Sequence, residues 1–276
     1  MATTQKAVSP KKNQGFQGIR AAIWVIVVCL IIAICIYKFL LGNPSNFAGN
    51  DPAGHPTNLL GTIYKGGIIV PIIQTLLLTV IALSIERWLA LRTAFGKGSL
   101  AKFVLNVKAA VSKGDFAAAQ SICDKQRGSV ANVVSASLRA YKEMETAPGL
   151  KKAQKVAKIQ QAHEEATQLE MPTLQMNLPI LATIVTLGTL TGLLGTVIGM
   201  IRSFQALAAG GGGDSLALST GISEALINTA FGILTSWCSV IAYNTFTNKI
   251  DKLTYALDEV GYSIAQTYEA NHTDEA

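Results

Sequence analysis

TGLLGTVIGMIRSF, residues 191 to 204, contains three glycines and no charged residue before Arg202. Each glycine inside a helix costs roughly 0.5–1 kcal/mol relative to alanine, so a helix in water seldom contains so many. The stretch lies within a longer uncharged run, and a helix of about 20 apolar residues is long enough to cross a bilayer. We therefore expect a membrane helix in which the glycines allow close packing.

The composition of the whole chain supports this interpretation. Of its 276 residues, 50% are hydrophobic and only 14% are charged, which is unusual for a water-soluble domain and common in membrane proteins. Four apolar segments are long enough to span a bilayer, and they predict transmembrane helices over 21–41, 66–90, 178–208 and 222–248. The predicted fold class is an all-α integral membrane protein whose long helices extend into the cytoplasm.

Charge asymmetry predicts the orientation of these spans. The only large polar segment, 91–177, is rich in lysine and reads as helices, one of them capped by Asp115. The positive-inside rule puts this segment in the cytoplasm, together with the basic N-terminal residues 1–20 and the C-terminal helix or tail 249–276. The loops 42–65 and 209–221, which are poor in basic residues, are then periplasmic, and the net charge of +6 reflects topology.

The first apolar segment also follows a basic start, as a signal peptide does. It is long for a signal peptide, and no convincing cleavage site follows it. We expect a retained span, with removal as the alternative.

Cysteine and histidine spacing gives no support for a metal site, a disulfide or a cofactor. The four cysteines form no CxxC pair, and the histidines at 55, 163 and 272 lack partners at ligand spacing, so we expect each histidine to be solvated. No nucleophile and base set, phosphate loop or nucleic-acid motif is present. The sequence therefore predicts neither an enzyme nor a nucleic-acid-binding protein.

The third span carries two adjacent stripes of small and polar residues. At 100° per residue, four glycines fall within about 60° of one another and form a ridge suited to helix packing. Beside them lies a stripe of hydroxyl side chains. The ridge consists of Gly188, Gly192, Gly195 and Gly199, and the stripe of Thr189, Thr196 and Ser203.

The fourth span carries a polar face of about 140°. Its members are Glu224, Asn228, Thr229, Gly232, Thr235, Ser236, Ser239 and Tyr243. A polar face on a membrane helix turns toward protein or water, so the two spans predict a shared polar interior. By itself the spacing leaves Glu224 equally open to a role as an interfacial acid.

Two motifs on these spans, GLLGTVIGMIRSF and GISEALINTAFGIL, resemble the paired signature of the MotA/TolQ/ExbB proton-channel family, and ExbB and TolQ most of all. The tight match covers 179–248, and IERWLALR, residues 85–92, resembles the exit of the family's first span. The resemblance implies that Thr196 and Thr229 line a pore and that Glu224 is the glutamate of the EAL motif. With the two faces, the expected proton-path residues are Thr196, Thr229, Glu224, Asn228, Thr189, Ser203 and Thr235.

The resemblance also implies partners and a location. Family members form a homopentamer in the bacterial inner membrane, around a dimer of single-span ExbD- or TolR-like proteins that carry the protonatable aspartate. The expected function is that of an ExbB-like subunit that uses the proton motive force to energise a TonB-like protein for outer-membrane transport. The alternatives are a TolQ-like envelope-maintenance motor and a non-conducting membrane scaffold.

Two features depart from the family pattern. The first apolar span has no counterpart in the three-span ExbB/TolQ layout. Asn228 stands where the family usually has a small apolar residue, so the polarity of this surface differs from the family's.

Overall fold

The computed structural model describes residues 22–52, 54–209 and 215–273. These residues form helices and no strand, with one isolated β-bridge between Phe47 and Pro56. The basic N-terminal cluster and the centre of the second predicted periplasmic loop lie outside the described residues. The described residues divide into two compact units, one within 22–87 and 177–247 and the other within 88–176 and 248–273.

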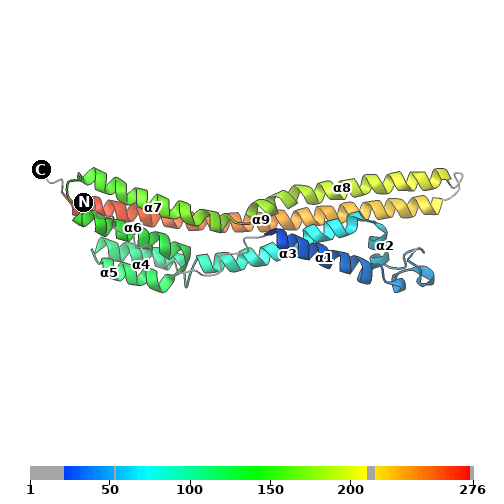
Figure 1. The fold of residues 1–276 in the computed structure, drawn as a ribbon, viewed down its shortest axis with the longest axis horizontal. Helices are drawn as coiled ribbons and strands as arrows, with labels where there is room; N and C mark the ends of the chain where they lie inside the picture. The colour runs from blue at the N-terminus through cyan, green and yellow to red at the C-terminus, as the bar shows by residue number, and fades with distance from the viewer. Residues whose placement is uncertain (1–21, 53, 210–214, 274–276) are drawn as a thin grey trace, which may run out of the picture. The chain divides into compact units, whose positions relative to one another are not determined.

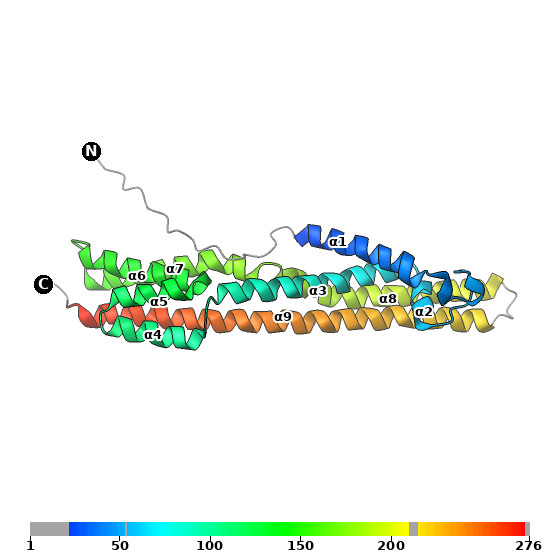
Figure 2. The ribbon, with the colours of Figure 1, turned by 90° about the horizontal axis from the view of Figure 1, so that it is seen from below.

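The first unit, called the membrane unit below, contains the apolar helices. They are α1 (Ala22–Cys35), continued by the π-helical η1 (Ile36–Leu41), α3 (Ile69–Ala94) up to Arg87, α8 (Leu178–Ala209) and the first part of α9 (Ser215–Asn271) (Figures 1 and 2). Four helical stretches of the described chain are long and apolar enough to cross a membrane: Ala22–Leu41, Ile69–Ala94, Lys152–Gln205 and Gly221–Asn271. The predicted fold class and number of spans are confirmed.

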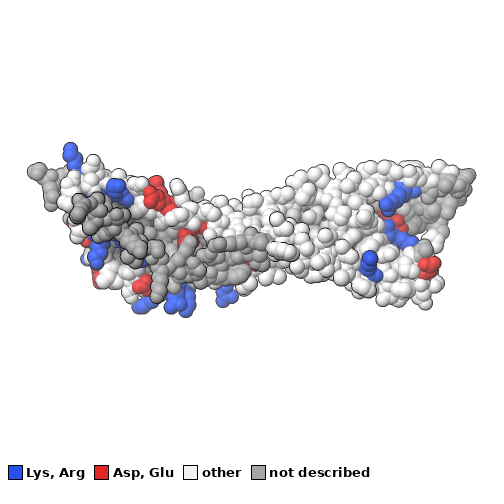
Figure 3. All heavy atoms as spheres, in the orientation of Figure 1, with Lys and Arg blue, Asp and Glu red and all other residues white. Residues whose placement is uncertain are grey.

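Charged side chains are sparse on the membrane unit. On the face drawn in Figure 3, its surface is a broad band of uncharged atoms, and the charges gather at the end where α2 (Leu59–Lys65) lies. The helices α1, α3, α8 and α9 all expose large apolar side chains, including Trp24, Ile81, Leu190 and Trp237. Such surfaces are stable against lipid and unfavourable in water.

The end of the first span is built into the rest of the membrane unit. The Tyr37 hydroxyl donates to the carbonyl oxygen of Tyr64 over 3.0 Å, and the two rings stack with centroids 4.7 Å apart. The Asn46 amide donates to the carbonyl oxygens of Leu40 and Leu41, each over 2.9 Å. Through these contacts, η1 and the short 3₁₀ helices η2 (Pro44–Asn46) and η3 (Ala48–Asn50) join the first span to α2.

A buried ion pair lies where α3 leaves the membrane unit. The side chains of Glu86 and Arg87 are 5% and 0% exposed, and Arg87 Nε donates to Glu86 Oε2 over 2.7 Å. Asn177, in the two-residue break between α7 and α8, donates from Nδ2 to the same carboxylate oxygen over 3.2 Å. A buried charge is tolerated when it is paired and hydrogen-bonded, as this carboxylate is.

The second unit is a helical bundle. It contains α4 (Leu100–Ser112), α5 (Phe116–Gln126), α6 (Gly128–Thr146), α7 (Lys152–Gln175) and the remainder of α9. Apolar side chains spaced at helical intervals form its core, among them Val107, Val133, Ile159, Leu253, Leu257 and Ile264. Asp115 caps α5 as predicted, because its carboxylate accepts a hydrogen bond from the Ala118 amide over 2.8 Å.

The structure corrects the expectation that every histidine is solvated. His55 is exposed, but His163 on α7 is 7% exposed. Its Nδ1 lies 2.9 Å from the Ser137 hydroxyl, and its ring packs on Gly261, where a Cβ atom would collide with it. The sequence did not indicate this burial, because Ser137 and Gly261, which contact the imidazole ring, lie on other helices.

Cys123 on α5 gives a prediction about the bundle. It is 1% exposed, and burial raises the pKa of its thiol from the ordinary value of 9.0 to about 11. Because the thiolate is the reactive species, at pH 8 the folded chain should hold about a hundredfold less Cys123 thiolate than the unfolded chain. The raised pKa also means that this thiol favours the folded state below about pH 9 and loses that contribution as the pH rises toward about 11.

Maleimide labelling of a chain in which Cys29, Cys35 and Cys238 are replaced by serine tests this prediction. We expect slow labelling of the folded chain at pH 8 and rapid labelling in denaturant. Equal rates in the two states would contradict the buried position of Cys123.

Candidate functional site

The centre of the candidate site is a pair of threonines on neighbouring membrane helices. The Thr196 hydroxyl on α8 and the Thr229 hydroxyl on α9 are in hydrogen-bond contact. Both also lie within reach of the Gly192 carbonyl oxygen, at 3.2 Å from Thr196 Oγ1 and 3.1 Å from Thr229 Oγ1. Both side chains are half-buried. Three oxygens from two helices thus form one small hydrogen-bonded cluster.

Glycines bring the two helices close enough for this contact. A Cβ added to Gly232 on α9 would lie 2.6 Å from the Gly188 carbonyl oxygen and 2.7 Å from Gly192 Cα. A Cβ added to Gly195 would lie 2.6 Å from Asn228 Cβ, and one added to Gly199 would lie 2.7 Å from Ala225 Cβ. All four glycines of the ridge therefore face α9 of the same chain.

Glu224 lies one and a half turns from Thr229 along α9, on the wall of a cavity of about 280 Å³. The cavity is also lined by Lys65 and Arg202, which place two positive charges near the carboxylate. The remaining lining residues come from α8, α9, the α2–α3 junction and the segment 54–56. A polar cavity of this size has room for several water molecules.

Asn228 connects the wall of the cavity to the C-terminal end of α2. Its Nδ2 donates to the Gly66 carbonyl oxygen over 3.1 Å, and the side chain is 3% exposed. This bond orients the amide, so that Oδ1 is left as a buried acceptor without a partner among the described residues. An acceptor in this position can receive a hydrogen bond from a water molecule in the cavity.

The other expected proton-path residues lie in different surroundings. Ser203 lines the cavity, is 3% exposed, and donates to the Gly199 carbonyl oxygen over 2.9 Å. Thr189 donates to the Ser236 hydroxyl over 2.8 Å, two turns from Thr196 on α8. Thr235 is fully buried and donates to the Phe231 carbonyl oxygen of its own helix over 2.9 Å. Within one chain, the structure brings together Thr196 and Thr229, groups Glu224 with Asn228 and Ser203, and separates Thr235 from both groups.

Sequence reasoning did not find Lys65, Gly66 and Arg202 as members of the site. Gly66 packs closely on Asn228, because a Cβ there would lie 2.7 Å from Asn228 Oδ1 and the amide would have to shift. The two cations could have been noticed as basic residues at the ends of apolar segments, but nothing in the spacing places them beside Glu224. Among the described residues, no group of His, Cys, Asp and Glu is arranged to hold a metal ion.

The profile of the MotA/TolQ/ExbB proton channel family matches residues 127–259, which include α8, the Thr196–Thr229 pair and Glu224. The chain thus resembles this family over 133 of its 276 residues. This match confirms the resemblance inferred from the two motifs. The family consists of membrane transport and motor proteins and is not a known enzyme family.

Individual relatives include both branches of the family. The Tol-Pal system protein TolQ of Pseudomonas aeruginosa is 29% identical over 205 residues, which cover 71% of this chain and 86% of TolQ. The biopolymer transport protein ExbB of Helicobacter pylori is 39% identical over 80 residues, 29% of this chain and 55% of that protein. An ExbB-like protein of Synechocystis is 37% identical over 87 residues, 31% of this chain and 41% of the relative. The matches to these ExbB-type relatives thus span about half of their length.

Proposed function

We propose that the chain is the ring-forming subunit of a proton-driven motor of the bacterial inner membrane, of the ExbB type. The observation that carries this proposal is the hydroxyl contact between Thr196 and Thr229, beside a polar cavity that contains Glu224. Polar groups inside membrane helices are costly and mark ion or proton pathways.

The oxygen cluster has chemistry suited to a proton path. Each threonine hydroxyl has one proton to donate and also accepts hydrogen bonds. Thr196 can donate to Thr229, which then donates to the Gly192 carbonyl oxygen, or the order of the two hydroxyls can be reversed. The cluster therefore has two hydrogen-bond directions with the same heavy-atom positions. It can respond to an acid that gains and loses a proton nearby without adding a fixed charge.

In this proposal the protonatable aspartate is supplied by a partner. A homopentamer of the chain surrounds a dimer of ExbD- or TolR-like single-span proteins, and the threonine cluster faces the partner's acid. Glu224 lies five residues before Thr229, or about 7.5 Å along the helix, and the polar cavity around it forms the periplasmic approach to the cluster. The N- and C-termini and the helical bundle lie in the cytoplasm, and a TonB-like protein receives the work.

The second candidate is a TolQ-like motor that maintains the cell envelope. It is favoured by the TolQ alignment, which covers 71% of this chain. The ExbB-type and TolQ-type functions can be distinguished by expressing the chain, with an ExbD- or TolR-like partner encoded beside it, in a strain that lacks both the ExbB and the TolQ systems. Restored TonB-dependent uptake supports the ExbB type, whereas restored resistance to detergent without uptake supports the TolQ type. Absence of proton flux in vesicles that contain both proteins would leave only the non-conducting scaffold.

Replacement of Glu224 by glutamine tests the cavity. Glutamine keeps the size and hydrogen-bonding capacity of the side chain but removes its charge and its exchangeable acid proton. We expect normal assembly and a fall of at least about tenfold in proton-coupled uptake. The matched control is Glu143→Gln, at an exposed site on α6, which should leave uptake unchanged. Normal uptake by assembled Glu224→Gln would remove this residue from the path.

A further inference from the structure

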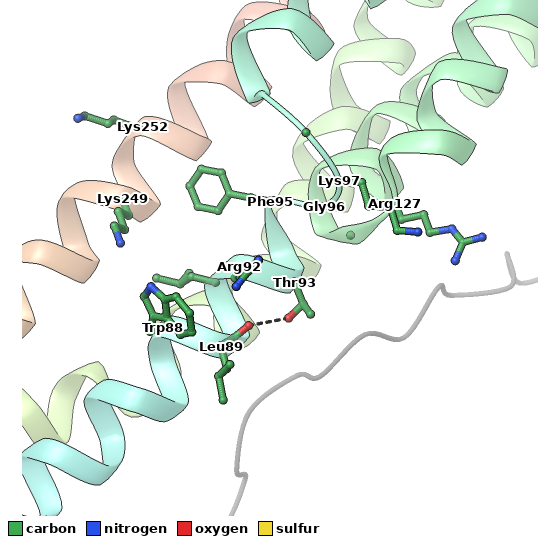
Figure 4. Close-up of a pocket in the computed structure, with 13 residues that line it drawn as sticks. Trp88, Leu89, Arg92, Thr93, Phe95, Gly96, Lys97, Arg127, Lys249 and Lys252 are labelled. Carbon is green, nitrogen blue, oxygen red and sulfur yellow. Dashed lines mark hydrogen bonds between the residues drawn. The ribbon is translucent and has the colours of Figure 1, made fainter.

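A large cavity in the helical bundle unit has no role in the proposed proton path. Its volume is about 1190 Å³, and it lies among the C-terminal end of α3, the segment 95–98, the start of α6 and α9 (Figure 4). Five of its lining residues are basic and none is acidic. The basic residues are Arg92, Lys97, Arg127, Lys249 and Lys252.

One side of the cavity combines these charges with exposed apolar surface. Trp88 and Leu89 are 48% and 43% exposed, and the Arg92 guanidinium lies over the Trp88 ring, 5.4 Å from its centroid. Figure 4 shows Lys249 and Lys252 of α9 on one side of Phe95, and Lys97 and Arg127 on the other. In this view Arg127 and Lys252 extend away from Phe95 on opposite sides, and Arg92 is the cation stacked on the aromatic wall.

This wall lies at the end of an apolar helix. Trp88 follows the long uncharged part of α3, and tryptophan and basic residues at such a position mark the interface between membrane and water. A ligand that fits the wall must be anionic where it meets the cations and apolar where it meets Trp88 and Leu89. A free phosphate ion satisfies only the first requirement.

We propose that this cavity binds an anionic phospholipid of the cytoplasmic leaflet. The phosphodiester lies between Arg92 of α3 and Lys249 of α9, with Lys252 one turn further along α9, and an acyl chain lies along Trp88 and Leu89. Basic pockets at the cytoplasmic ends of membrane helices are suited to such headgroups. The inference rests on the proposed orientation, with the helical bundle on the cytoplasmic side, and it does not depend on the proton path.

Fluorescence quenching at Trp88 tests the proposal in the full chain. Replacement of Trp24 and Trp237 by phenylalanine leaves Trp88 as the only tryptophan of the sequence. The chain in neutral detergent micelles is titrated with phosphatidylglycerol or phosphatidylcholine, each brominated on its acyl chains, and quenching is expressed relative to each variant's unquenched emission. We expect phosphatidylglycerol to quench at a lower mole fraction than phosphatidylcholine.

Charge variants then identify the site. Each cation near a headgroup is worth about 1 kcal/mol, so the double variant Arg92→Gln/Lys249→Gln should weaken phosphatidylglycerol binding about 30-fold. The matched control, Lys113→Gln/Lys142→Gln, removes two charges from exposed positions of the same unit that do not line the cavity. It should change the affinity for phosphatidylglycerol less than twofold. The charge-preserving variant Arg92→Lys/Lys249→Arg should keep most of the affinity, and circular dichroism checks the folding of all three.

Several results would overturn the proposal. They are equal quenching by the two lipids, no quenching by either, equal losses in the test and control variants, and loss of affinity in the charge-preserving variant. Glycerol phosphate and inorganic phosphate serve as soluble competitors. Displacement of the lipid by either at millimolar concentration would identify a site for free phosphate instead.

Discussion

Valine at Thr196 or Thr229 is expected to leave the assembled protein intact and to reduce proton-coupled uptake to less than about a tenth. Valine has nearly the shape of threonine, so the packing of α8 on α9 is kept. When one hydroxyl is removed, the other still reaches the Gly192 carbonyl oxygen, so no buried donor loses its partner. What is lost is the ability of the pair to reverse its hydrogen-bond direction.

Serine at either position should retain most of the uptake, because it keeps the hydroxyl. The matched controls are Thr183→Val on α8 and Thr245→Val on α9. Both threonines are exposed, and each donates to a carbonyl oxygen of its own helix, that of Pro179 at 2.8 Å and that of Ile241 at 2.7 Å. Proton-coupled uptake and subunit cross-linking are measured in parallel. Full uptake with valine at both 196 and 229 would show that the hydroxyls serve packing only.

The fold could be predicted from the sequence wherever the signal was local. Four apolar runs indicated the spans, and the Lys-Gly-Asp sequence at 113–115 indicated the start of a helix, because a cap depends on residues three positions apart. Burial of His163 by Ser137 and Gly261 could not be predicted, since those partners belong to other helices and leave no periodic pattern.

The candidate site likewise combines features that local sequence predicts with contacts between distant segments that it does not. Helical periodicity placed Thr196 and Thr229 on two polar faces, but it contains no information on the register between those faces. The contact depends on which turn of α8 meets which turn of α9. The Asn228 bond to the Gly66 carbonyl oxygen joins residues 162 positions apart, so its effect on the orientation of the amide required the structure.

The close approach of α8 and α9 leads to the second large expected effect. Gly232→Leu should destabilise the chain by more than about 3 kcal/mol, because even the first carbon of the new side chain would collide with backbone atoms of Gly188 and Gly192. Backbone atoms cannot move aside as the end of a flexible side chain can. Gly232→Ala adds that first carbon alone and should cost about 1–3 kcal/mol. The control Thr186→Leu places the same side chain on an exposed position of α8 and should be tolerated.

A cross-link within one chain reports directly on this packing. The hydroxyls of Thr189 and Ser236 are 2.8 Å apart, so Thr189→Cys/Ser236→Cys in a background without native cysteines should form a disulfide within a single chain. Gly232→Leu should abolish the cross-link, whereas Thr186→Leu should preserve it. Cross-links that instead join two chains would show that the glycine ridge packs between subunits. In that case Gly232→Leu would act on assembly, and the α8–α9 contact that brings Thr196 to Thr229 would have to form across the subunit boundary.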